Sequence, residues 1–171
     1  MKFYAGIGSR KTPKEILELM ARIAIKLESL GWVLRSGGAG GADSAFGDAV
    51  KNKIIYIPWD GFDNGTNKIY SGKGVVVGSS DQARQMASEL HPAWDRCSAG
   101  AQKLHSRNIY QVLGEEINPS SYSRFIICWT PNGEAVGGTA TAIKLAEQNG
   151  IEVFNLADDA TITRLKKLIG E

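Results

Sequence analysis

The stretch Ser36–Ala45 reads SGGAGGADSA, and four of its first six residues are glycine. Each glycine in regular structure costs roughly 0.5–1 kcal/mol relative to alanine, because glycine loses more backbone freedom on folding. So many glycines together indicate a backbone that adopts conformations closed to other residues, or that another group approaches closely. We interpret Gly37–Gly41 as a turn whose N–H groups lie within hydrogen-bond distance of a phosphate, where a Cβ atom would interfere.

Strand and helix patterns alternate along almost the whole chain. Short apolar runs, several of them β-branched, predict strands at 2–7, 32–35, 53–58, 74–80, 123–130 and 151–156. Helical spacing predicts a first helix that Thr12 caps and Gly31 ends, and further helices at about 42–51, 81–90, 94–114, 139–149 and 158–170. This alternation is typical of an α/β fold, and we expect a Rossmann-like parallel sheet with helices on both faces.

Length and composition narrow the class of protein. A chain of 171 residues, 43% hydrophobic and 22% charged, suits a single globular domain over 1–171. The net charge of +2 argues against binding to extended nucleic acid, but a local basic cleft would not show in that total. The sequence shows no signal peptide and no apolar run long enough to cross a membrane, so we expect a cytoplasmic protein whose two cysteines are reduced.

Three of the predicted strands end in small or glycine-containing turns, at 6–13, 36–43 and 130–141. In a parallel sheet these turns lie on one edge, and each opens a helix whose first N–H groups are unpaired and carry partial positive charge. Such an edge suits phosphate. None of the turns has the full dinucleotide fingerprint, and the nucleoside-triphosphate motif GxxxxGK[ST] is absent from the sequence.

Individual side chains at this edge admit two interpretations. Arg10 is either a bidentate clamp for phosphate or carboxylate, or a solvated surface arginine. Asp43 caps its helix, accepts a hydrogen bond from a ribose or base, or does both. Arg107 and Asn108 either contact a ligand or form the polar face of a helix.

The other polar residues give little sign of metal or cofactor chemistry. His91 and His105 are interpreted as structural, and no group of His, Cys, Asp and Glu has the spacing of metal ligands. We therefore expect no metal and no cofactor. The long loop at 59–74 is either a lid over a site or an ordinary insertion.

Four segments together resemble the DprA/LOG (SLOG) superfamily: GIGSR after the first strand, SGGAGGADSA, LHSRNIY, and GGTATAIKLAEQNGIEVFNL. The chain is most similar to short DprA-like proteins that consist of the Rossmann-type domain alone. The resemblance implies a nucleotide or single-stranded nucleic acid as partner, and homo-oligomers formed through helices that flank the sheet. It also implies a phosphate-binding site made of Gly8, Ser9, Arg10, Ser36, Gly37, Gly38, Gly40, Gly41, Asp43, Arg107, Asn108, Gly137, Gly138 and Thr139.

The sequence departs from the LOG branch at the position that matters for catalysis. LOG enzymes are nucleotide phosphoribohydrolases with the motif PGGxGTxxE, whose glutamate is catalytic. Here Ala140 replaces the third glycine and Lys144 stands in place of the glutamate, so that activity does not carry over directly. Glu134 or Asp43 is the candidate catalytic carboxylate if the protein hydrolyses an N-glycosidic bond.

Three functions stay open on the sequence alone. The first is a DprA-like protein that binds a nucleotide or the phosphates of single-stranded DNA. The second is an N-glycosidase acting on a nucleoside 5′-monophosphate. The third is a small-nucleotide sensor or carrier without chemistry.

Overall fold

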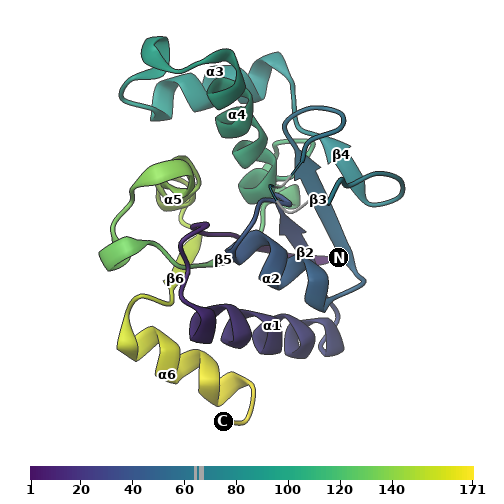
Figure 1. The fold of residues 1–171 in the computed structure, drawn as a ribbon, viewed down its shortest axis with the longest axis vertical. Coiled ribbons are helices and arrows are strands. Elements are labelled where there is room, and N and C mark those ends of the chain that lie inside the picture. Colours follow the sequence, from purple (N-terminus) through teal and green to yellow (C-terminus); the bar gives the residue numbers. More distant parts are fainter. Residues whose placement is uncertain (64, 66–67) are drawn as a thin grey trace.

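Six parallel strands form one sheet in the order β4-β3-β2-β1-β5-β6 in the computed structural model, which describes residues 1–63, 65 and 68–171 (Figure 1). The strands are β1 (Lys2–Gly6), β2 (Trp32–Ser36), β3 (Lys53–Ile57), β4 (Val75–Val77), β5 (Phe125–Cys128) and β6 (Glu152–Asn155). The prediction of an α/β fold with a parallel sheet is confirmed.

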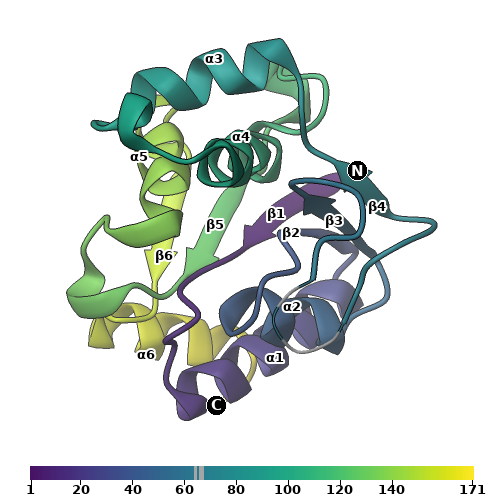
Figure 2. The ribbon, with the colours of Figure 1, turned by 45° about the horizontal axis from the view of Figure 1, so that its top comes forward.

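Helices cover both faces of the sheet, as Figure 2 shows. One layer holds α1 (Lys14–Ser29), α2 (Ala42–Ala49) and α6 (Asp159–Leu168), and the other holds α3 (Asp81–Leu90), α4 (Ala99–Leu113) and α5 (Ala140–Gln148). Short 3₁₀ helices lie in the described connections: η1 (Trp94–Arg96), η2 (Pro119–Ser121), η3 (Pro131–Gly133) and η4 (Gly137–Thr139). Within the described ranges, no helix combines the length and the apolarity that crossing a lipid bilayer requires.

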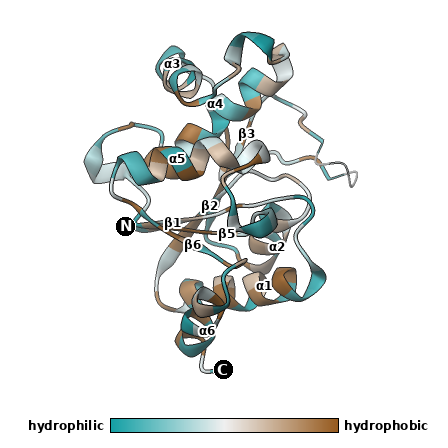
Figure 3. Ribbon diagram, turned by 90° about the vertical axis from the view of Figure 1, so that its left-hand side faces the viewer, coloured by the Kyte–Doolittle hydropathy of each residue, from teal (hydrophilic) through white to brown (hydrophobic). Residues whose placement is uncertain are grey.

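The apolar core is divided by the sheet into two layers, and the helices turn their hydrophobic sides toward it (Figure 3). Below the sheet, α1 buries a stripe at helical spacing, namely Ile16, Leu19, Met20, Ile23, Ala24 and Leu27. Above it, Ile109 and Leu113 of α4 pack in one cluster with Ala5 and Ile126. This periodicity is why the sequence located the helices well.

The helix ends were predicted less well than the helices. Gly31, with φ +86°, follows the end of α1 as expected. Thr12 does not cap that helix: its Oγ1 donates to the Ser9 carbonyl at 2.6 Å, and Pro13 occupies the cap position. The helical pattern over 94–114 divides into η1 and α4, because Ser98 caps a new start by accepting from the Ala101 N–H at 3.1 Å.

The loop at 59–74 is packed against β3 at both ends of its described part. Phe62 and Tyr70 are buried in a small cluster with Ile55 and Ile57. Residues 64, 66 and 67 lie outside the described residues. The two interpretations of this loop, lid and insertion, stay predictions.

The strand order places a topological switch point between β1 and β5. Strand β2 pairs with one edge of β1, and β5 pairs with the other edge, where Gly6 lies beside Ile127. The loops that follow these two strands therefore diverge at the carboxyl edge of the sheet. Ligands of open α/β sheets bind in the crevice that such loops leave.

Candidate functional site

A cavity of about 550 Å³ lies at this switch point. Its walls come from the loop after β1, the start of α2, one face of α4 and the loop between β5 and α5. Of the residues predicted for the site, the lining contains Gly8, Ser9, Arg10, Asp43, Arg107, Asn108, Gly137, Gly138 and Thr139. The structure thus brings together four segments that are separate in the sequence.

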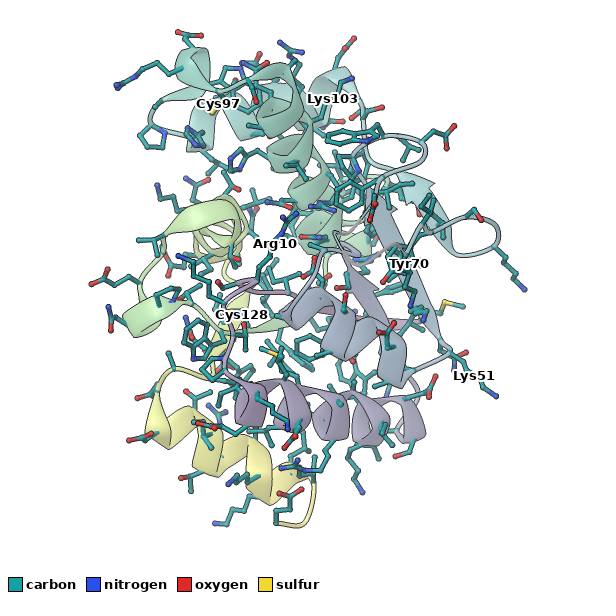
Figure 4. All side chains as sticks on the ribbon, viewed as in Figure 1. Arg10, Lys51, Tyr70, Cys97, Lys103 and Cys128 are labelled. Carbon is teal, nitrogen blue, oxygen red and sulfur yellow. The ribbon has the colours of Figure 1, made fainter. Side chains whose placement is uncertain are left out.

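Arg10 and Lys11 supply positive charge at the cavity. Both side chains are exposed and both line it, and Figure 4 shows Arg10 near the middle of the molecule, between α2 and the layer of α4 and α5. The starts of α2 and α5 adjoin the same space through Asp43 and Thr139. Neither of these two described helix starts has a side-chain cap, although the Ala42 N–H donates to the Ser9 carbonyl at 3.4 Å and the Ala140 N–H to the Gly137 carbonyl. What both starts direct at the cavity is the positive end of a helix dipole, which favours an anion.

The remaining predicted residues, Ser36, Gly37, Gly38, Gly40 and Gly41, do not line the cavity. Ser36 Oγ donates to the Gly6 carbonyl at 2.6 Å, which ties β2 to β1. A Cβ on Gly37 would lie 2.7 Å from Asp43 Oδ2, and one on Gly41 would lie 2.6 Å from the Cα of Arg10. At Gly37 and Gly41 the close approach that a Cβ would obstruct comes from the protein itself, and a role of these two glycines toward phosphate stays a prediction.

Arg107 is buried and holds two loops in place. Its Nη1 donates to the Gly37 carbonyl at 2.5 Å and to the Tyr56 carbonyl at 2.8 Å. Burial lowers the pKa of Arg107 to about 10, while nearby Asp43 opposes that effect, so the guanidinium stays charged at neutral pH. These bonds make Arg107 a positioning residue for the ends of β2 and β3.

Asn108 has a similar role on the other side of the cavity. Its Nδ2 donates to the Gly138 carbonyl at 2.8 Å, and its Oδ1 accepts from Arg107 Nε at 3.0 Å. The side chain therefore joins α4 to the loop that precedes α5. In the structure both members of the predicted pair are engaged by protein groups.

Asp43 is the buried carboxyl group of the cavity wall. Its Oδ2 accepts from the Ala39 N–H at 3.2 Å, so it closes the preceding loop and does not cap its own helix. Burial raises the pKa of Asp43 to about 6, and the opposing charge of Arg107 limits the rise. The group is mostly ionised at pH 7 and takes up a proton in mildly acidic solution.

Two polar residues of α4 that line the cavity were not among the predicted site residues. Gln111 is buried and follows Arg107 by one helical turn, and His105 faces the cavity while its Nδ1 lies 3.0 Å from Thr141 Oγ1. Burial lowers the pKa of His105 to about 4, with smaller effects of His91 and Arg107, so its ring is neutral at neutral pH. The available signal was the spacing of His105, Asn108 and Gln111, three polar residues placed three apart, which puts them along one side of the helix.

Glu134, the other candidate for a catalytic carboxylate, is exposed and does not line the cavity. It follows η3 in the loop after β5. Of the two candidate catalytic carboxylates, Asp43 is therefore the one that lines the cavity.

Three possible metal ligands gather at one place where the sequence shows no ligand spacing, and the expectation of no metal stays a prediction. His91, Cys97 and His105 gather where the end of α3, η1 and α4 meet, with their ligand atoms within 4.8 Å of one another. The spacing in the sequence is irregular because the chain turns back between α3 and α4. Motifs of regular spacing do not detect such a cluster.

Comparison with known proteins gives only distant similarities. No protein-family model matches the sequence, and no curated protein matches it. One similar solved structure is DNA processing protein A from Helicobacter pylori, which is described for its single-stranded DNA binding mode. It is 18% identical with a TM-score of 0.41, and the match covers 97% of this chain and 81% of that chain. The molybdenum cofactor carrier protein of Chlamydomonas reinhardtii is 16% identical with a TM-score of 0.39, covering 100% of both chains. Neither likeness identifies a ligand for this protein.

Proposed function

We propose that the protein binds the phosphate group of a nucleotide in the cavity at the switch point. The observation that carries the proposal is the convergence of two uncapped helix starts, an exposed arginine and an open glycine turn on one cavity. An added Cβ on Gly137 or Gly138 would meet no atom within 4 Å, so this turn leaves room beside its backbone. Helix N-termini and guanidinium groups are the usual protein partners of phosphate.

The size of the cavity favours a single nucleotide over a long strand. Small-molecule sites commonly have volumes of about 300–1,000 Å³, and this cavity measures about 550 Å³. The net charge of +2 also gives little general attraction for a polyanion. A terminal or extruded nucleotide of a single strand would present the same phosphate chemistry.

A second candidate function rests on Asp43. A carboxyl group with a pKa raised to about 6, in the wall of a nucleotide-sized cavity, has the properties of an acid–base group or of a stabiliser for an oxocarbenium-like sugar. In this reading the protein cleaves the N-glycosidic bond of a nucleoside 5′-monophosphate, with Arg10 and the helix starts on the phosphate. A sensor or carrier would use the same cavity without this step.

One screen separates these functions. The protein is incubated with nucleoside mono- and diphosphates, cyclic nucleotides, short single-stranded oligonucleotides and inorganic phosphate, its thermal unfolding is followed, and each mixture is then chromatographed. Ligand binding raises the Tm by mass action. Release of free base identifies a glycosidase, which Asp43→Asn must then inactivate. A raised Tm with intact ligand identifies a binding protein.

The matched variants are Arg10→Ala and Arg164→Ala, because both arginines are exposed but Arg164 pairs with Glu152 far from the cavity lining. Arg10→Ala should abolish most of the ligand-induced rise in Tm, and Arg164→Ala should leave it intact. A full rise in the Arg10 variant, or no rise with any of the phosphates, would overturn the proposal.

A further inference from the structure

The cluster of His91, Cys97 and His105 lies next to the cavity but is not part of the proposed phosphate site. His91 ends α3, Cys97 follows η1 and His105 lies on α4, and all three side chains are partly buried. Figure 4 shows Cys97 at the end of the molecule where α3 and α4 meet, well away from Cys128. Of the two cysteines, only Cys97 therefore belongs to the cluster.

The distances within the cluster match those of a tetrahedral metal site. Cys97 Sγ lies 3.6 Å from His91 Nε2 and 3.8 Å from His91 Nδ1, and the two imidazole rings have centroids 4.6 Å apart. Zinc binds nitrogen at about 2.0–2.1 Å and sulfur at about 2.3 Å, which in a tetrahedron separates the two ligand atoms by about 3.6 Å. The separation of Cys97 Sγ and His91 Nε2 is thus already that of two ligands of one ion, and the other ligand atoms lie within 4.8 Å of these two.

Hydrogen bonds around the cluster orient the rings. His105 Nδ1 lies 3.0 Å from Thr141 Oγ1, and donation from this nitrogen leaves Nε2 as the ligand atom. Asn108 Nδ2 lies 3.3 Å from the same hydroxyl and holds it in place. His91 Nδ1 accepts from the Ala93 N–H at 3.0 Å, so coordination through Nε2, the nitrogen 3.6 Å from Cys97 Sγ, moves the ring proton to Nδ1 and breaks this bond.

We propose that His91, Cys97 and His105 bind a divalent transition metal, with zinc the best-suited ion, through three protein ligands. Thiolate and imidazole together select zinc and related ions over magnesium or calcium, which prefer oxygen ligands. Three protein ligands leave one tetrahedral position for water or another small ligand. His105 is shared between this site and the cavity wall, so an ion here would fix a side chain that faces the nucleotide.

Cobalt is the first probe, because Co²⁺ substitutes for zinc and its thiolate complexes absorb light. Chelator-treated, reduced protein is titrated with Co²⁺, and we expect a thiolate-to-cobalt charge-transfer band that saturates at one ion per chain and disappears on addition of Zn²⁺. Cys97→Ser should remove the band. The matched variant Cys128→Ala should keep it, because Cys128 is buried at the end of β5 and its pKa is raised to about 12 by burial.

The affinity for Zn²⁺, measured by competition with a chromophoric chelator, should fall in Cys97→Ser by more than the roughly 10–100-fold typical of a lost outer-shell partner. Circular dichroism establishes whether each variant is folded. A band that persists in folded Cys97→Ser, or no band in the wild-type protein, would overturn the proposal.

A second measurement needs no variant. The wild-type protein is alkylated at its thiols with and without Zn²⁺, and the modified peptides are quantified by mass spectrometry. Zn²⁺ should protect Cys97, whereas Mg²⁺ at the same concentration should not. Equal alkylation of Cys97 with and without Zn²⁺ would mean that the cluster is a hydrogen-bonded Cys–His group without a metal.

Discussion

Gly138 and Gly37 both belong to the predicted site, but their surroundings differ. An added Cβ would meet nothing within 4 Å at Gly138, whereas at Gly37 it would lie 2.8 Å from Arg107 Nη1 and 2.7 Å from Asp43 Oδ2. The first glycine leaves space in a cavity wall, and the second permits packing inside the protein. Substitutions by alanine separate these two roles.

Gly138→Ala should leave the Tm of the free protein nearly unchanged and weaken nucleotide binding. A methyl group there obstructs the approach of an anion to the turn, and one lost hydrogen bond to a charged group corresponds to about 10–100-fold in Kd. Gly37→Ala should instead lower the Tm without any ligand present. Calorimetric titration and thermal unfolding of both variants test the pair, and equal binding by Gly138→Ala would remove this turn from the site.

Asp43 should make the protein less stable as the pH rises from about 4 to about 6. Its pKa is raised from 3.8 to about 6 by burial, so between these values the native state holds a proton that the unfolded chain has lost. The stability contributed by this group is full below the unfolded pKa and falls as pH rises, by about 3 kcal/mol in all. Denaturant unfolding of wild type and Asp43→Asn from pH 4 to 7 measures the difference, which should favour the variant increasingly toward pH 7. A constant difference would contradict the raised pKa.

At the scale of elements, α4 joins the parts of the site. Arg107 bonds the loop after β2 and the end of β3, and Asn108 bonds the turn before α5. Two loops and one strand end at the sheet edge are therefore held by consecutive residues of one helix. Their relative positions depend on α4 more than on the sheet itself.

Arg107→Met should destabilise the protein by about 3–5 kcal/mol, the range found when one member of a buried charged pair is removed. It leaves the carbonyls of Gly37 and Tyr56 without this donor and leaves the Asp43 charge uncompensated. Denaturant unfolding measures the loss. Adding Asp43→Asn should recover part of it, because the second change removes the uncompensated charge, and strict additivity of the two losses would contradict this coupling.

Prediction from sequence succeeded for elements and failed where side chains meet across elements. The helical stripe of α1 and the apolar run of β5 have periodicities that one sequence shows directly. The bonds of Arg107 and the gathering of His91 with Cys97 depend on how α4 lies against its neighbours, which local pattern does not contain. Gly37 and Gly41 stand out in the sequence, but the contacts that leave no space for a Cβ atom there come from tertiary packing.

At the scale of the whole molecule, the two core layers share one sheet. Tyr4 and Ile127 pack with α1, and the adjacent Ala5 and Ile126 pack with α4. Alternating residues of the same strands thus belong to different layers. Neither layer can lose its packing without disturbing strands that the other layer needs. A single domain over 1–171 remains a prediction, as does the association of copies.

Ile23→Val and Ile109→Val test whether the two core layers unfold together, because these two fully buried residues lie in opposite layers. Each should cost about 1 kcal/mol and lower one common Tm by about 2–4 °C. Far-ultraviolet circular dichroism and tryptophan fluorescence should report the same transition in both variants. Two transitions, each shifted by only one variant, would show two independently folding units.

The tight packing at Gly37 and Gly41 bears on how such chains diverge in evolution. Selection for folding alone is enough to preserve Gly37 and Gly41, because a Cβ atom at either position would collide with the protein itself. Arg10 and Gly138, which are exposed in the cavity wall, are free of that demand. Substitutions at these cavity residues can therefore alter what the site accepts while the two packed glycines keep the scaffold unchanged.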